Sequence, residues 1–372
     1  MNKTLTLVCV VPGLAPVVDG VGDYALVLAR QLRKKFSIDT HFIVGDPAWT
    51  GETQIDGFAV SRVKERSVKG FLPLLSNSNL GTTVVLLHYV GYGYDINGCP
   101  GWLVDGLQRW RSALNTRSLI TMFHEVYASG PPWTTTFWVS GVQKNLAARL
   151  MRISDSCFTN KKLYADLLYR LSCGKHTKIL SMPIFSNVGE LKQPPPLEKR
   201  TRRIVVFGNR DSRIRVYRKS LITLYRICRF LGIKEVLDIG PPTGLNLSVI
   251  KGVPIVQMGK LPAAEISNFL SDSCGGFLRY PPAFLAKSTI FAAYCAHGML
   301  PVNFRGNALR VDGLEAGRHY WVLNKTNTAP CDLTGLQAVA DNAYAWYKTH
   351  DLAVHAETLV GCLDNLGVKT KP

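Results

Sequence analysis

The chain has 372 residues, 47 % of them hydrophobic, which is enough apolar material for two cores of ordinary size. Its 44 Lys and Arg outnumber 26 Asp and Glu, and the formal net charge of +18 suits nucleotide phosphates, other polyanions or an anionic membrane surface. Nine cysteines without a C-x-x-C pair argue against a disulfide framework or a zinc site. Pro12 comes too early for a signal peptide and no apolar run would cross a bilayer. We therefore expect a cytoplasmic protein, free or peripheral at the inner membrane face.

The first half of the chain reads as strands alternating with helices. Short apolar runs predict strands at 5–11, 40–44, 58–63, 82–87, 118–123, 156–159 and 179–183. Apolar residues at i, i+3 and i+4 spacing predict a first helix reaching Phe36, and further helices at 64–75, 102–114 and 140–152. This alternation is typical of a parallel sheet covered by helices on both faces.

A glycine-containing turn joins the first strand to the first helix. Gly20 and Gly22 lie in it, and neither has a Cβ that would keep a ligand or another loop away from the backbone. The free N–H groups and the positive dipole end of the following helix are a place for an anion. An ordinary βα turn would look the same, and this stretch alone favours neither interpretation.

A second series of alternating strands and helices follows a proline-rich segment. Residues 191–199 contain three consecutive prolines among polar neighbours, which predicts a stiff linker. Beyond it we expect strands at 204–207, 235–239, 274–278 and 300–303, and helices at 219–231, 263–270 and 288–296. The predicted fold class is α/β, with two doubly wound, Rossmann-like parallel sheets facing a central cleft. The domains would be 1–190 and 200–335, with a helical tail, 336–372, packing back toward the first.

Two histidines stand where buried strands of the first domain end. His88 and His124 lie on the ligand-facing edge, and His124, followed by Glu125, is a candidate catalytic residue. A histidine in such a place is, however, more often structural. The next segment contains the aromatic residues Tyr127, Trp133, Phe137 and Trp138. These form either core packing or a stacking surface for a sugar or a lipid-linked acceptor.

The second domain carries the denser positive charge. Eleven basic residues lie between positions 199 and 229: Lys199, Arg200, Arg202, Arg203, Arg210, Arg213, Arg215, Arg218, Lys219, Arg226 and Arg229. We expect Arg210, just beyond the strand, and Lys219, at the predicted start of the next helix, to converge on one anion. Lys287, Ser288 and Thr289 open a later helix and predict a second phosphate site. Two such sites on neighbouring strand ends would fit a diphosphate.

These features resemble the GT-B glycosyltransferases, in particular the retaining group with a glycosyltransferase family 4-like layout. The segment D-G-V-G-D-Y-A-L-V-L-A-R-Q-L is similar to that group's first turn and helix, with Asp19 where its first glycine stands. I-T-M-F-H-E resembles its T-x-H-[DE] strand end, and V-V-F-G-N-R with Y-R-K-S resembles its V-G-R…K-G phosphate clamp. I-S-D-S-C-F-T-N, M-G-K-L and F-A-A-Y-C-A-H-G-M-L-P-V match further segments in order, so that the likeness spans nearly the whole chain.

The resemblance implies a retaining hexosyltransferase that moves a sugar from a UDP- or GDP-linked donor to a glycan, lipid-linked or small-molecule acceptor. It implies neither a metal nor another cofactor. His124 would face the transferred sugar. The donor diphosphate would contact Gly20, Gly22, Arg210, Lys219, Lys287, Ser288 and Thr289. Gly259, Lys260 and Leu261 would lie near the nucleotide base, and His88, Glu125 and Trp133 on the acceptor side.

One departure weakens this interpretation. The group's E-x7-E glutamates, which contact the donor sugar and ribose, fall near Leu285 and on Ala293. Lysine and hydroxyl side chains at 287–289 suit phosphate, but they cannot replace glutamate as acceptors from sugar hydroxyls. A non-catalytic GT-B-like protein that binds a sugar nucleotide or partners an active transferase is therefore the alternative.

The positive charge of the chain raises two further possible partners, an anionic membrane and nucleic acid. The basic helix predicted at 140–152 would suit docking on anionic lipid, although a solvated helix face is the more ordinary explanation. Nucleic acid is not expected, since the chain shows no recognisable binding module and no interleaving of aromatic with basic residues.

Overall fold

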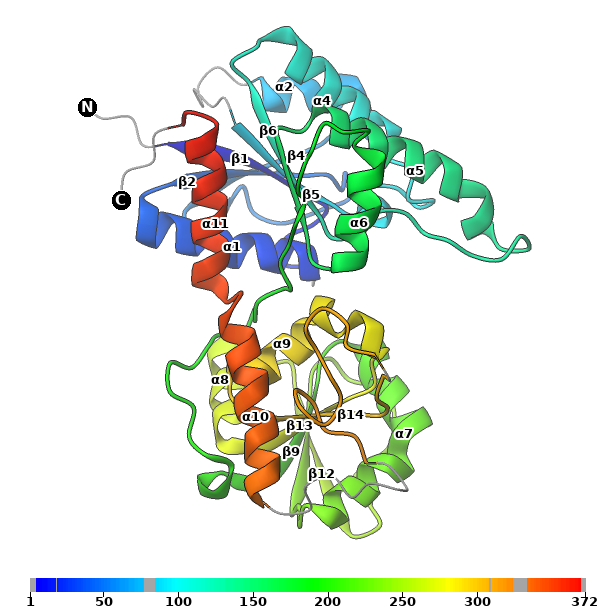
Figure 1. Cartoon of the computed structure of the whole chain (residues 1–372), viewed down its shortest axis with the longest axis vertical. Coiled ribbons are helices and arrows are strands. Elements are labelled where there is room, and N and C mark those ends of the chain that lie inside the picture. The colour runs from blue at the N-terminus through cyan, green and yellow to red at the C-terminus, as the bar shows by residue number, and fades with distance from the viewer. Residues whose placement is uncertain (1–4, 18, 77–83, 308, 324–332, 369–372) are drawn as a thin grey trace. The chain divides into compact units, whose positions relative to one another are not determined.

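The computed structural model describes residues 5–17, 19–76, 84–307, 309–323 and 333–368, and these fall into two compact units. Unit 1 takes in the residues up to Met182 together with those from Leu352 onward. Unit 2 runs from Pro183 to Asp351. Each unit has its own sheet and its own buried core (Figure 1).

Among the described residues, unit 1 forms an eight-stranded sheet in the order β3-β4-β2-β1-β5-β6-β7-β8. All its strand pairs are parallel except β3 with β4. The strands are β1 (Thr6–Val11), β2 (Asp39–Val44), β3 (Gln54–Ile55), β4 (Phe58–Arg62), β5 (Val84–Tyr89), β6 (Ser118–Phe123), β7 (Ser156–Thr159) and β8 (Leu180–Ser181). Positions 82 and 83 of the predicted fourth strand lie outside the described residues.

Helices cover both faces of this sheet. They are α1 (Gly20–Phe36), α2 (Val68–Leu75), α3 (Gly91–Tyr94), α4 (Gly101–Ala113), α5 (Thr135–Ile153), α6 (Lys162–Leu171) and α11 (Leu352–Asn365). Val8 and Val10 of β1 join the core cluster with α4 and α5, whereas Leu7 and Cys9 meet α1. Because successive side chains of a strand point to opposite faces, a strand covered on both sides must be apolar throughout.

Unit 2 contains, among its described residues, a six-stranded sheet in the order β11-β12-β10-β9-β13-β14, parallel except for β11 with β12. Its strands are β9 (Thr201–Phe207), β10 (Glu235–Ile239), β11 (Val249–Ile250), β12 (Val253–Gly259), β13 (Ser273–Leu278) and β14 (Leu300–Asn303). Its helices are α7 (Arg210–Phe230), α8 (Ala263–Asp272), α9 (Thr289–Ala296) and α10 (Leu333–Lys348), with 3-10 turns η2 (Leu197–Lys199) and η3 (Pro282–Lys287). The prediction of two parallel, doubly covered sheets is confirmed.

The proline-rich segment 191–199 packs against unit 2 and does not stand between the units as a linker. Pro194 lies so close to Gly298 that a Cβ on that glycine would come within 2.5 Å of it. Leu197 is buried, and its N–H donates to Oε1 of Gln337 at 2.7 Å. Hydrophobic burial and a side-chain acceptor hold this segment, and the chain divides after residue 182 instead of near 191.

The predicted C-terminal tail, 336–372, is divided between the units. In α10, the Tyr347 hydroxyl accepts from the N–H of Ser186 at 2.8 Å, which holds this helix within unit 2. In α11, His355 shares a hydrogen bond of 2.7 Å with the Tyr24 hydroxyl of α1, so this helix belongs to unit 1. Residues 369–372 of the tail lie outside the described residues.

Candidate functional site

The strand order of unit 2 reverses between β9 and β13. In open parallel sheets, ligands bind beyond the carboxyl ends of the strands at such a reversal. Helix α7 begins just beyond β9, with the Asn209 side chain accepting from the N–H of Ser212 at 2.8 Å. Helix α9 follows β13 through η3, with the Ser288 hydroxyl accepting from the N–H of Phe291 at 3.2 Å. Two helix N-termini, each with a positive dipole end, therefore flank this point.

Glycines let three turns pack tightly together at this edge. A Cβ on Gly208, which has φ 134°, would lie 2.5 Å from Cδ1 of Ile290 in the first turn of α9. A Cβ on Gly240, at the end of β10, would overlap the Gly208 carbonyl oxygen. The N–H of Gly240 also donates to the Gly259 carbonyl at 2.8 Å. Gly259, the first residue of the predicted base-side segment 259–261, therefore contacts Gly240, which itself packs against the β9–α7 turn.

Arg213 is a buried residue that links two loops at this edge. Its Nη1 lies 2.7 Å from Oδ1 of Asp238 in β10, and the two side chains are only 2 % and 4 % exposed. Its Nε donates to the Gly208 carbonyl at 3.1 Å, and its Nη2 donates to the Pro241 carbonyl. One buried guanidinium therefore fixes both loops by charge-assisted hydrogen bonds. The sequence placed Arg213 in the basic run but gave no sign of its partner.

Arg210 is an exposed cation at this edge. Its side chain is 58 % exposed, and its Nη1 lies 3.8 Å from Asp211, which is itself exposed. At that separation and exposure the pair contributes little. Arg210 is the first residue of α7, so its guanidinium adds to the positive end of the helix.

The expected convergence of Arg210 and Lys219 on one anion is wrong. Helix α7 begins at Arg210, not at Lys219. Lys219 comes nine residues later, about 13 Å farther along the helix axis and half a turn around it. The cap residue Asn209 was the sequence signal for the earlier start, but the polar first turns of α7 concealed it.

The second predicted phosphate segment is located as expected, at the start of α9. Ser288 is the buried cap of this helix, Thr289 is its first residue, and Lys287 ends η3. The neighbouring positions of the missing glutamates, Leu285 and Ala293, are fully buried. A ligand at this edge would therefore meet hydroxyl and N–H groups, but no side chain at either glutamate position.

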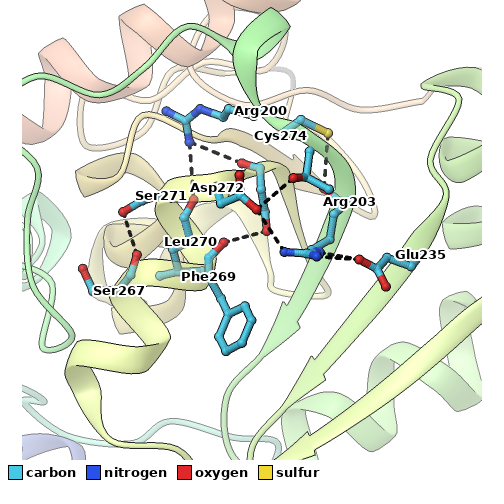
Figure 2. Close-up of polar contacts among 11 residues, drawn as sticks. Arg200, Arg203, Glu235, Ser267, Phe269, Leu270, Ser271, Asp272 and Cys274 are labelled. Carbon is cyan, nitrogen blue, oxygen red and sulfur yellow. Dashed lines mark hydrogen bonds and ion pairs between the residues drawn. The ribbon is translucent and has the colours of Figure 1, made fainter.

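Two arginines of the basic run, Arg200 and Arg203, form ion pairs and hydrogen bonds at the opposite, amino-terminal edge of the same sheet (Figure 2). Arg203 pairs with Glu235 at 2.6 Å and with Asp272 at 3.2 Å. Arg200 is buried and donates to backbone carbonyls, including those of His297 at 2.8 Å and Ser273 at 3.3 Å. Burial lowers the pKa of Arg200 to about 10, so it stays charged at neutral pH. These arginines stabilise the fold and do not belong to the anion site.

In unit 1, the N-terminus of α1 already holds a carboxylate. Asp19 accepts from the N–H groups of Val21 and Gly22 at 2.7 and 2.9 Å. Burial raises the pKa of Asp19, and burial together with Asp19 raises the pKa of Asp23 to about 6. A Cβ on Gly22 would overlap the Gly13 carbonyl, so the glycine serves loop packing. The carboxylate occupies the N–H groups that a phosphate would need, which counts against the predicted phosphate contact there.

His88 and His124 meet inside unit 1. Nδ1 of His88 lies 3.0 Å from Nε2 of His124, and the Tyr24 ring packs edge-on against both. Burial lowers the pKa of His88 to about 3, so this ring is neutral at physiological pH. Tyr24 in turn binds His355. No sequence signal pointed to His355, which is 331 residues from Tyr24.

The three predicted acceptor-side residues do not form one cluster. His88 is fully buried in the central strand β5, whereas Glu125 lines a cavity of about 140 Å³ with Tyr127 and Gln143. Trp133 lies outside that cavity and is exposed. The basic face predicted at 140–152 is also partly neutralised, because Arg149 of α5 pairs with Asp105 at 2.5 Å.

No known family profile matches the sequence, and no curated protein matches it either. Solved structures do match. The pneumococcal O-GlcNAc transferase GtfA in complex with UDP and GlcNAc aligns at a TM-score of 0.61 and 10 % identity, over 99 % of this chain and 100 % of that one. An alpha-glucosyltransferase in complex with UDP and DNA aligns at 0.55 and 10 % identity, over 98 % and 100 %. The chain has the GT-B fold. A third GT-B-like match, S. aureus MnaA with UDP, aligns at 0.51 and 10 % identity, over 98 % of each chain.

In the part of the chain that the structure describes, no helix is long and apolar enough to cross a membrane.

Proposed function

We propose that this chain is a glycosyltransferase that takes a sugar from a nucleoside diphosphate donor, and that the diphosphate binds unit 2 alongside Gly208, Arg210, Ser288 and Thr289. The observation that carries the proposal is the meeting of two helix N-termini at the strand-order reversal, with one exposed arginine beside them. The matched structures with bound UDP support it through their shared fold.

The chemistry follows from where charge develops. When the bond between the anomeric carbon and the diphosphate oxygen breaks, its electron pair goes to the diphosphate, and an acceptor oxygen bonds to the carbon in its place. Backbone N–H groups, helix dipoles and the Arg210 guanidinium are fixed before the reaction, so they would stabilise this leaving group without reorganisation. We propose that transfer is metal-independent for this reason. Retention of configuration rests on the resemblance to the family 4-like group.

We assign the sugar-facing role to His124. This rests on its place at the carboxyl end of β6, the ligand-binding edge of the unit 1 sheet, and on the same resemblance. His88 would act as a positioning residue, since its ring is buried and bonded to His124. A glycan, a lipid-linked sugar or a small molecule remains the proposed class of acceptor, with UDP or GDP as the nucleotide.

A second candidate is a non-catalytic protein that binds a sugar nucleotide. The specific observation in its favour is that Leu285 and Ala293, the positions of the family's glutamates, are buried apolar side chains. A protein of this kind would bind the nucleotide at the same edge of unit 2 but would not release the sugar.

Calorimetric titration with UDP and GDP tests the site, using Arg210→Ala and, as the matched control, Lys219→Ala. Losing one charge-assisted contact should weaken nucleoside diphosphate binding roughly tenfold to a hundredfold in Arg210→Ala. Lys219→Ala, an exposed cation elsewhere on the same helix, should bind as the wild type does. Equal affinity in Arg210→Ala would place the anion site elsewhere.

Measuring free nucleoside diphosphate released from UDP- and GDP-sugars separates the two candidates. Release that depends on an added acceptor supports transfer. Tight binding with no release across glycan, lipid-linked and small-molecule acceptors supports the non-catalytic candidate. Absence of binding to every nucleoside diphosphate would refute both.

A further inference from the structure

The loop before α5 and the first turns of that helix carry large aromatic side chains that are exposed in the described structure. Trp133 is 84 % exposed, Trp138 74 %, Val142 53 % and Phe137 44 %. We call the three aromatic residues, together with the neighbouring Val142, the aromatic tip. Large apolar side chains gathered at the surface mark interaction sites more often than chance, whereas single ones do not.

The backbone presents the tip in a fixed form. The N–H of Thr134 donates to the Pro131 carbonyl at 3.0 Å, its hydroxyl donates to the same oxygen at 2.7 Å, and the helix starts at the next residue. The rings of Phe137 and Trp138 pack edge to face at 5.4 Å. These contacts hold the backbone at the helix start and the Phe137–Trp138 pair, and Figure 1 shows this loop and the start of α5 reaching away from the rest of unit 1.

The two halves of α5 differ in what they contact. The buried residues of this helix begin at Gln143 and continue through Leu146, Ala147, Leu150 and Met151. Its second half is thus anchored in the core of unit 1, while its first eight residues bury no side chain. This division explains why core periodicity predicted a helix only from residue 140.

Charge indicates what the tip meets. Between Glu125 and Asp155 the sequence has no acidic residue, and it has Lys144, Arg149 and Arg152. Carboxylates are thus absent from the loop and from all of α5, in a chain of net charge +18. Tryptophan and phenylalanine beside basic side chains favour the interface of an anionic bilayer, where the rings reach the acyl boundary and the cations meet lipid phosphates.

We propose that the aromatic tip inserts into the interfacial layer of an anionic lipid bilayer and holds this protein at the membrane surface. Lys144, exposed just after the tip, would meet lipid headgroups. This differs from docking through the basic face of α5, where Arg149 is already paired with Asp105. The inference does not depend on the proposed activity, because it concerns a surface of unit 1 and its test requires no substrate.

Flotation with vesicles of phosphatidylglycerol and phosphatidylcholine, compared with phosphatidylcholine alone, tests the proposal. The wild type should float with the anionic vesicles, and its tryptophan emission should shift to the blue as the rings leave water. Trp133→Ser combined with Trp138→Ser should lower the partition coefficient at least roughly tenfold. The matched control is Ile222→Ser, which removes a 64 % exposed apolar side chain from α7, and it should float like the wild type.

Several results would overturn the proposal. The first is wild-type protein that does not float with anionic vesicles. The second is a double tryptophan variant that floats as well as the wild type and melts at the same temperature. The third concerns solution size: if the wild type self-associates without vesicles and the double variant is monomeric, the tip is an interface between two copies of this chain. Binding that vanishes at high salt together with the emission shift would show surface attraction without insertion.

Discussion

The buried pair of Arg213 and Asp238 makes the sharpest prediction for unit 2. Replacing Arg213 with Met keeps an unbranched apolar side chain but removes the charge, the ion pair with Asp238 and the hydrogen bonds to the Gly208 and Pro241 carbonyls. The Asp238 carboxylate, 4 % exposed, would then lie buried opposite a thioether.

The expected cost is large because the loss is one-sided. Breaking a fully buried pair by removing one partner costs about 3–5 kcal/mol, since the remaining charge has lost its compensation. For a unit of this size, each kcal/mol lowers the melting temperature by about 2–4 °C. We therefore expect Arg213→Met to lower the melting temperature of unit 2 by roughly 6–20 °C.

Scanning calorimetry and urea unfolding measure this change, and a double variant separates its two causes. Arg213→Met with Asp238→Leu removes both charges, and it should recover most of the lost stability because apolar replacements of a buried pair are often neutral. In both variants the loops at Gly208 and Pro241 would lack their hydrogen bonds to Arg213. Nucleoside diphosphate binding should therefore be weakened in the single and in the double variant. A loss below about 1 kcal/mol in Arg213→Met would refute the reasoning, since it would place the pair among solvent-screened surface pairs.

Two further predictions concern unit 1. Gly22→Ala should destabilise the protein by about 1–3 kcal/mol in urea unfolding, because the new Cβ would overlap the Gly13 carbonyl. Gly20→Ala, whose Cβ would meet nothing within 4 Å, should change stability by less than about 1 kcal/mol; equal effects would contradict the packing assigned to this turn. The pKa of His88 is lowered to about 3 in the folded state, so the unfolded state binds more protons and stability should fall as pH drops from about 6.5 toward 3, by up to about 1.4 kcal/mol per pH unit. His88→Asn, whose amide can still bond to His124 but does not titrate, should show a shallower decline in unfolding free energy, and an unchanged slope would mean that other groups cause it.

The candidate site was only partly predictable, and both failures came from overlooking a capping residue at the start of a helix, Asn209 in α7 and Asp19 in α1. Ser288 and Thr289 were placed correctly at a helix start because capping is a local property of a few consecutive residues. Lys219 was misplaced because the start of α7 was judged from apolar periodicity, which its polar first turns lack. The phosphate contact expected at Gly20 and Gly22 overlooked that Asp19 could cap that helix itself.

The sequence by itself determined the two parallel, doubly covered sheets, because strands buried on both faces must be continuously apolar and the helices between them must be amphipathic. Only the tertiary structure decided which charges remain available. Arg213 is neutralised by a carboxylate on another strand, whereas Arg210, three residues earlier, stays exposed. Likewise, only packing separated the buried His88 from the exposed Trp133. Periodicity is set by neighbours within one or two turns, but burial and ion pairing depend on residues brought together from distant parts of the chain.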